Sequence, residues 1–209
     1  MKGLEKLTCV RLAEVISQKN TISSEVITDA LYAQDKHGDP FVQTLVGAGH
    51  ITEWDLAKLV AENFQLPFLM ASSYAISDEA KKKVPEKFLF ENLIVPLDLF
   101  DDALCVVMPI LTPYETLSKL QRETKTEVFP YVGLISENKK VLGTIYPTFK
   151  PWFEAEQKRR EQAATKRANT KGQAGDWMSI FDAGDQAIQD NLGGIGSNQK
   201  KSTPPPGKR

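Results

Sequence analysis

The stretch RLAEVISQKNTIS, from Arg11 to Ser23, decides the fold because a related stretch returns further along the chain as PFVQTLVGAGHIT, from Pro40 to Thr52. The return has a constant offset of 29 residues, which is the distance from residue 16 to residue 45. The matched pairs are Ile16 with Leu45, Asn20 with Gly49, Ile22 with Ile51, Ser23 with Thr52, Ile27 with Leu56, and Gln34 with Asn63. Any two amphipathic helix pairs look alike in outline, but a shared cap, break and apolar stripe favour a tandem helical repeat.

Each copy of the repeat has the features of two amphipathic helices separated by a short break. Ser23 and Thr52 are good N-cap residues, and each is followed by an acidic residue in the first helical turn, where a negative charge suits the helix dipole. The apolar stripes of both copies need a partner to cover them. We therefore expect one shared core that contains Ile16, Ile27, Leu31, Leu45, Leu56 and Val60.

From Leu66 onward the pattern changes to that of a small α+β unit. Leu66-Pro67-Phe68 ends the helical stretch. The first expected element is a short helix from Ser77 or Asp78 that Pro85 terminates, and it is followed by strands over 93–99 and 103–108 joined by a hairpin turn. A helix to about Glu123 then opens with the capping box Thr112-Pro113-Tyr114-Glu115. The last two elements are a strand over 126–132 and a helix from Ser136 to Tyr146.

The predicted fold class is therefore α+β: an N-terminal tandem helical repeat packed with a small unit of about three strands, and then a disordered tail. We assign residues 1–66 to the helical repeat, residues 67–149 to the α+β subdomain, and residues 150–209 to a charged tail. Residues 154–171 are nearly all charged or small, and they are expected to form a solvated helix or no structure.

An apolar island interrupts the polar tail at residues 176–190. Its large side chains recur at spacings that place them near one face of a short helix. We expect them to bind a protein partner, and the alternative is that they fold back onto the body of the chain. The residues concerned are Trp177, Met178, Ile180, Phe181 and Ile188.

The composition excludes several classes of function. The net charge of −1 and the pI near 6.2 give no overall field that would attract a nucleic acid polymer. No apolar run approaches the roughly 20 residues that span a bilayer, and the first residues do not make a signal-peptide core. We therefore expect a cytoplasmic protein that does not bind nucleic acid polymers and does not insert into membranes.

No residue pattern points to a metal or to catalysis. Cys9 and Cys105 have no CxxC neighbour, and His37 and His50 have no second ligand at metal-binding spacing. No GxSxG stretch or Cys/His pairing is present. The sequence therefore predicts a protein that is not an enzyme and has no metal or cofactor.

Residues 8 to 149 resemble the N-terminal domain of type II secretion and type IV pilus assembly ATPases, of the MshE N-terminal type. The resemblance rests on the helical repeat, on the LP[FY] bridge at Leu66-Pro67-Phe68, and on the α+β unit that follows it. In the members that bind cyclic di-GMP, each copy resembles RLGxxLVxxGxIxxxxLxxxLxxQ. The first copy here keeps that frame from Arg11 to Gln34, but Ala13 and Asn20 replace the two glycines. The motor domain of these ATPases carries a phosphate-binding GxxxxGK[ST] loop, which is missing from these 209 residues.

The second copy departs further, because Pro40-Phe41-Val42 stands where the pattern has Arg-Leu-Gly and Asn63 replaces the last glutamine. In a receptor of this type the arginine would contact the dinucleotide and the glycines would allow close approach of the backbone. The resemblance carries a cyclic di-GMP site over to Arg11, Leu12, Ala13, Ile16, Asn20, Leu31, Gln34, Leu45, Gly49 and Asn63.

The resemblance implies a non-enzymatic adaptor that docks to a protein partner in a pilus, secretion or motility machine. The alternative is a cyclic di-GMP receptor with a degenerate binding motif, which would use Arg11 and Gln34. A third interpretation is a structural relic without a ligand. Losing one arginine together with the glycines removes charge and close approach at the same time, so the adaptor is the preferred hypothesis.

Overall fold

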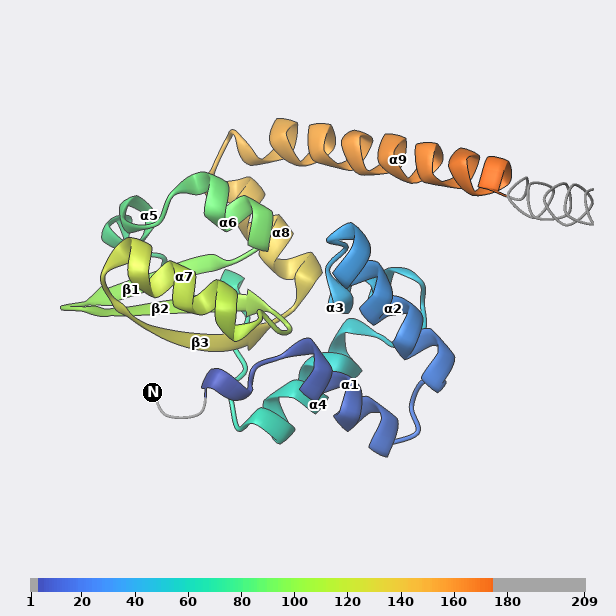
Figure 1. Cartoon of the computed structure of the whole chain (residues 1–209). Helices are drawn as coiled ribbons and strands as arrows, with labels where there is room; N and C mark the ends of the chain where they lie inside the picture. The colour runs from blue at the N-terminus through green and yellow to red at the C-terminus, as the bar shows by residue number, and fades with distance from the viewer. Residues whose placement is uncertain (1–3, 175–209) are drawn as a thin grey trace, which may run out of the picture. The chain divides into compact units, whose positions relative to one another are not determined.

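The structure is a computed structural model that describes the backbone of residues 4–174 and the side chains of residues 4–166. It divides into two compact units, Met1–Phe153 and Glu154–Arg209. The elements, shown in Figure 1, are η1 (Leu4–Lys6), α1 (Cys9–Gln18), α2 (Ser24–His37), α3 (Phe41–Gly47), α4 (Glu53–Phe64), η2 (Ala71–Ser73), α5 (Asp78–Lys83), α6 (Glu86–Asn92), β1 (Val95–Phe100), β2 (Ala103–Pro109), α7 (Tyr114–Thr124), β3 (Glu127–Gly133), α8 (Ile135–Ile145) and α9 (Phe149–Ala174).

The tandem helical repeat is confirmed: α1 and α2 form the first copy, and α3 and α4 form the second. The two predicted N-caps are also confirmed. The Ser23 hydroxyl accepts from the Val26 amide, and the Thr52 hydroxyl accepts from the Asp55 amide at 3.1 Å. These side chains satisfy amide donors that the first helical turn would otherwise leave unpaired, which is why the helices begin where they do.

Both copies contribute their apolar stripes to a single core, as the sequence predicts. Ile16, Leu45 and Leu56 are fully buried, and Leu31 is half-buried against the same cluster. Neither stripe could remain exposed without losing about 1.5–3 kcal/mol for each large aliphatic side chain. The repeat is therefore stable only as a packed pair of copies.

The second half of the first unit is built on a three-stranded mixed sheet in the order β1-β2-β3. β1 and β2 are antiparallel and are joined at Asp101-Asp102, where Asp101 takes a left-handed conformation with φ of 52°. β2 and β3 are parallel, and α7 connects them. A parallel bridge from Phe68 to Val132 attaches the segment that follows α4 to the edge of β3. The predicted fold class is confirmed in all these respects.

Two local predictions in this half are wrong, and one helix was not predicted. Pro85 ends α5 as predicted, but it is also the N-cap of α6, a helix that the sequence pattern does not indicate. The predicted capping box at Thr112 does not form, because α7 begins at Tyr114 with Pro113 as its N-cap, and the buried Thr112 hydroxyl has no partner. The last helix of this half begins at Ile135, one residue before the predicted cap Ser136.

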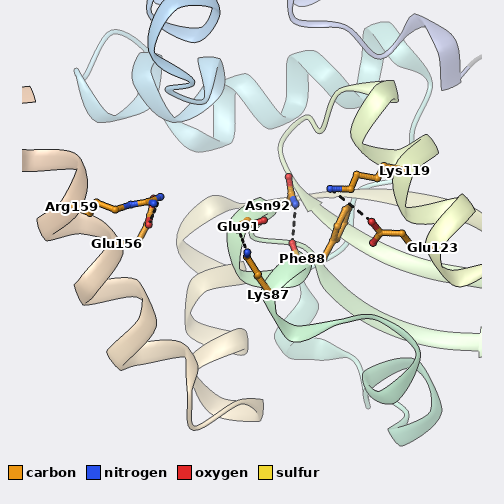
Figure 2. A network of polar contacts seen from close by, with 8 residues as sticks. All are labelled: Lys87, Phe88, Glu91, Asn92, Lys119, Glu123, Glu156 and Arg159. Carbon is orange, nitrogen blue, oxygen red and sulfur yellow. Dashed lines mark hydrogen bonds and ion pairs between the residues drawn. The ribbon is translucent and has the colours of Figure 1, made fainter. Parts of the chain in front are cut away.

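Figure 2 shows how the polar side chains of α6 and α7 are held. The Asn92 side chain donates to the Phe88 carbonyl at 2.9 Å, within the same helix. The Lys119 ammonium lies 5.9 Å from the centroid of the Phe88 ring and 3.8 Å from a Glu123 carboxylate oxygen. The Lys119–Glu123 pair is exposed and contributes little stability.

Two contacts between distant parts of the sequence fix the sheet and its helices. The buried Asn138 amide on α8 donates to the Leu93 carbonyl at 2.9 Å and to the Val107 carbonyl at 3.1 Å. A Glu53 carboxylate oxygen on α4 accepts from the Ser136 amide at 3.0 Å and from the Ser136 hydroxyl at 2.8 Å. Because α8 has no cap from its own N-cap residue Leu134, Glu53 supplies the missing acceptor from the helical repeat.

The second unit is described only by the helix that runs to Ala174. Of the two outcomes expected for residues 154–171, the helix is the one observed. Glu156 accepts from Arg159 at 2.7 Å, as Figure 2 shows. It also accepts from Arg160 at 3.0 Å, and these ion pairs lower the pKa of the Glu156 carboxyl. Within residues 4–174, no helix combines the length and apolar character that crossing a bilayer requires.

Candidate functional site

The break between the two helices of each copy has the same backbone geometry. Asn20, just after α1, has φ of 50°, and Gly49, just after α3, has φ of 74°. The Asn20 amide donates to the Ser17 carbonyl and the Gly49 amide to the Val46 carbonyl, which is the same bond shifted by one repeat. The positive φ explains Gly49 in the second copy, and asparagine is one of the few other residues that adopts it readily.

The one arginine that the dinucleotide motif retains is held by its own helix. Arg11 lies on α1, and its guanidinium is 2.7 Å from a Glu14 carboxylate oxygen. Both side chains are about half exposed. The equivalent position in the second copy is Pro40, the N-cap of α3, which carries no charge. The repeat therefore presents one cation, already paired, where the motif has two.

Most apolar residues of the predicted nucleotide site belong to the core. Leu12, Ile16 and Leu45 are fully buried, and Ala13 is 5% exposed. A side chain in such a position cannot flank a purine unless the helices separate. These four residues stabilise the repeat, and they form no open surface with Arg11.

The two amide side chains of the predicted site differ in their surroundings. The Asn63 amide donates back to the Leu59 carbonyl at 2.7 Å, within α4. Gln34 on α2 lies beside Cys9, and its buried side-chain oxygen has no hydrogen-bond partner in the structure. Burial raises the pKa of the Cys9 thiol to about 11, while the hydrogen bond with Gln34 acts in the opposite direction. Cys9 is therefore an unreactive neutral thiol.

Gln34 and Leu31 line a cavity of about 850 Å³ between η1, α1, α2 and α7, which we call the α1–α7 groove. The other residues that line it are Glu5, Leu7, Thr8, Cys9, Val10, Asp35, Pro113, Tyr114 and Glu115. The Tyr114 amide donates to the Leu7 carbonyl at 2.7 Å, which fixes the start of α7 beside the start of α1. Arg11 is not among the residues that line the groove, and Leu45 lines a smaller hollow of 270 Å³ between α2 and α3.

No sequence pattern predicts this groove. Its walls come from residues more than 100 positions apart, and neither helical periodicity nor the repeat offset relates α7 to α1. The one available signal is Val10, a large apolar residue next to the charged Arg11 and off the buried stripe of α1. Val10 is 61% exposed in the structure.

An exposed aromatic pair lies elsewhere on the first unit. Trp54 on α4 is 57% exposed and Phe68 is 37% exposed, and their ring centroids are 5.4 Å apart. Aromatic side chains left at a surface are common in protein-binding sites. The predicted partner-binding residues Trp177, Met178, Ile180, Phe181 and Ile188 lie outside the described residues. Among the side chains that are described, no group of three or more His, Cys, Asp or Glu could hold a metal ion.

Comparison with known proteins identifies structures that share this fold. No family model and no curated protein matches the sequence. The structure of MshE with cdg is 18% identical, covers 65% of this chain and 99% of that chain, and has a TM-score of 0.51. The structure of the N-terminal domain of XpsE is 20% identical, covers 68% of this chain and 96% of that chain, and has a TM-score of 0.52. The predicted resemblance is confirmed at the level of the fold: this chain has the fold shared by MshE and the N-terminal domain of XpsE.

Proposed function

We propose that this protein is a cytoplasmic docking module that binds a protein component of a pilus, secretion or motility machine and catalyses no reaction itself. The observation that carries the proposal is the state of the repeat. The helices that carry the dinucleotide motif are intact, but the one arginine that the motif retains is paired with Glu14, and most of its apolar residues lie in the core. What remains of the motif stabilises the body of the protein.

Charge supports the same conclusion. Cyclic di-GMP carries two phosphates, so a receptor needs cations or a row of amide donors facing it. The α1–α7 groove instead presents the carboxylates of Glu5, Asp35 and Glu115. Asp35 is balanced by Lys36 at 2.9 Å, an exposed pair that lowers the pKa of the Asp35 carboxyl. An anionic ligand gains little at such a site.

The proposed docking has two parts. The rigid first unit offers exposed apolar side chains, of which Trp54 and Phe68 form a pair. The island from Trp177 to Ile188 supplies a second contact that the sequence alone supports, because large apolar groups in a polar tail suit a partner's groove. A linked pair of contacts binds more tightly than either alone.

Affinity capture from the native host tests the proposal. The full chain is used as bait, together with a matched bait that lacks residues 172–209, and each capture is repeated with added cyclic di-GMP. We expect the full chain to recover a component of one such machine by mass spectrometry, independently of the dinucleotide, and the shortened bait to lose it while keeping its melting temperature. Recovery of no such component by the full chain would contradict the proposal, and a lower melting temperature of the shortened chain would show that the tail is part of the fold.

One observation favours the second candidate, a cyclic di-GMP receptor of altered geometry. The Gln34 oxygen is a buried acceptor without a partner, and a ligand with a donor group, such as a guanine edge, would satisfy it if the Gln34 side chain turned to expose that oxygen. Direct titration with cyclic di-GMP separates this candidate from the docking module.

A further inference from the structure

The α1–α7 groove has an apolar floor. Leu7 is buried beneath it, Leu31 and Tyr114 line it at partial exposure, and the side chain of Val10 stands at its edge. Its volume of about 850 Å³ lies in the range of cavities that bury a large side chain together with the backbone around it. A surface of this kind gains free energy when an apolar group covers it.

The charged groups that line the groove are all acidic. The carboxylates of Glu5, Asp35 and Glu115 line it, and none of its described lining residues is Lys, Arg or His. The start of α7 lies there as well, but its first amide is bonded to Leu7, and Glu115 in the first turn offsets the helix dipole. A complementary occupant supplies donors and positive charge.

Two occupants fit this chemistry poorly. A cyclic dinucleotide brings negative charge to a site that already carries it. The chain's own apolar island is also acidic: residues 174–190 contain Asp176, Asp182, Asp185 and Asp190 and neither Lys nor Arg. Like charges placed together at an interface disfavour binding.

We infer that the α1–α7 groove binds a segment of a partner protein that carries a large apolar side chain next to Lys or Arg. The apolar side chain covers Leu7, Val10 and Leu31. The cationic group meets Glu115 or Asp35. The inference rests on the proposed docking function and adds where the partner binds and what chemistry it presents.

A random peptide library displayed on phage and selected on the immobilised full chain provides the test. We expect the enriched peptides to share a large apolar residue within one or two positions of Lys or Arg. A labelled consensus peptide is then titrated by fluorescence anisotropy. Val10→Lys, which removes apolar contact and adds repulsion at an exposed position, should abolish binding, and Glu115→Gln should weaken it about two- to fivefold, the range of an exposed charge pair.

The matched control is Glu123→Gln, which removes the same charge near the other end of α7, where Glu123 pairs with Lys119. This control should bind as the unaltered chain does. Enrichment of acidic or uncharged peptides, no enrichment, equal binding by Val10→Lys, or displacement of the consensus peptide by cyclic di-GMP or by a peptide of residues 174–190 would each overturn the inference. Capture with a Val10→Lys bait also separates the two proposals. If this bait still captures the partner fully, the proposed groove site is wrong and the docking function stands. If the unaltered chain captures no partner, the docking function itself is contradicted.

Discussion

Asn20 and Gly49 occupy equivalent positions one repeat apart, and both hold the backbone in the left-handed region, with φ of 50° and 74°. Each ends the first helix of its copy and turns the chain toward a capped second helix. The departure of Asn20 from the glycine of the dinucleotide motif therefore preserves the fold. It adds a side chain at a place where a receptor would bring its backbone close to a ligand.

The first prediction concerns this left-handed break. Gly49→Ala should lower the free energy of unfolding by about 1–2 kcal/mol, the cost of a left-handed conformation for an L-residue. The loss is conformational, because a Cβ at Gly49 would meet no atom within 4 Å. Gly47→Ala, inside α3 and equally free of contacts, is the control and should be neutral or stabilising by up to about 1 kcal/mol. Urea denaturation of both variants measures the difference, and equal effects would contradict the shared role of Asn20 and Gly49.

The second prediction concerns the core that the two copies share. Leu56→Ala should lower the free energy of unfolding by about 2–5 kcal/mol, because Leu56 is fully buried between the copies. Val10→Ala, at a position that is mostly exposed, should change it by less than about 0.5 kcal/mol. An unchanged melting temperature for Leu56→Ala would show that the repeat does not pack as described.

The third prediction is that α4 stabilises α8 through Glu53. Glu53→Ala removes the acceptor for the Ser136 amide and hydroxyl and should cost about 1 kcal/mol, the usual loss on removing a helix cap. Glu62→Ala is the control on the same helix, since Glu62 only approaches Lys58 at 4.0 Å. Hydrogen exchange adds a local measurement, because the first turn of α8 should lose protection in Glu53→Ala alone. Equal protection in both variants would rule out the cap.

The fourth prediction concerns the Cys9 thiol. Its pKa of about 11 in the folded protein lies above the ordinary value of 9.0, so the folded state favours the neutral form. This contribution to stability is fully present below pH 9 and is lost as the pH rises toward 11. In a Cys105→Ala background, the rate of Cys9 alkylation should rise with a midpoint near pH 11, and Gln34→Leu should move the midpoint higher. A midpoint at or below pH 9 would show that Cys9 is not buried as described.

Local signals made most of the fold predictable. The caps at Ser23, Thr52 and Ser77 each act within one helical turn, so their sequence neighbours identify them. The cap of α8 was not predictable in this way, because Glu53 is 83 residues from Ser136. The capping box at Thr112 is wrong for a related reason: its sequence neighbours match the pattern, but tertiary packing buries the Thr112 hydroxyl and the helix begins one residue later than predicted.

The candidate site was less predictable than the fold. The motif identifies Gln34, but only the structure shows that Leu12, Ile16 and Leu45 are core and that Arg11 is paired with Glu14. A sequence motif records residue types at fixed spacing, and burial and ion pairing depend on what the rest of the chain places beside them. The α1–α7 groove depends on such placement entirely.

Isothermal titration of the full chain with cyclic di-GMP tests the central proposal, that the repeat keeps the fold shared with MshE but has no cyclic di-GMP site. We predict no saturable heat, or weak binding that Ala13→Gly and Asn20→Gly together strengthen by restoring close approach of the backbone. The same titration of Glu14→Gln, which removes the Arg11–Glu14 pair and so frees the Arg11 guanidinium, serves as a second comparison. A submicromolar dissociation constant for the unaltered chain, abolished by Arg11→Ala, would contradict the claim.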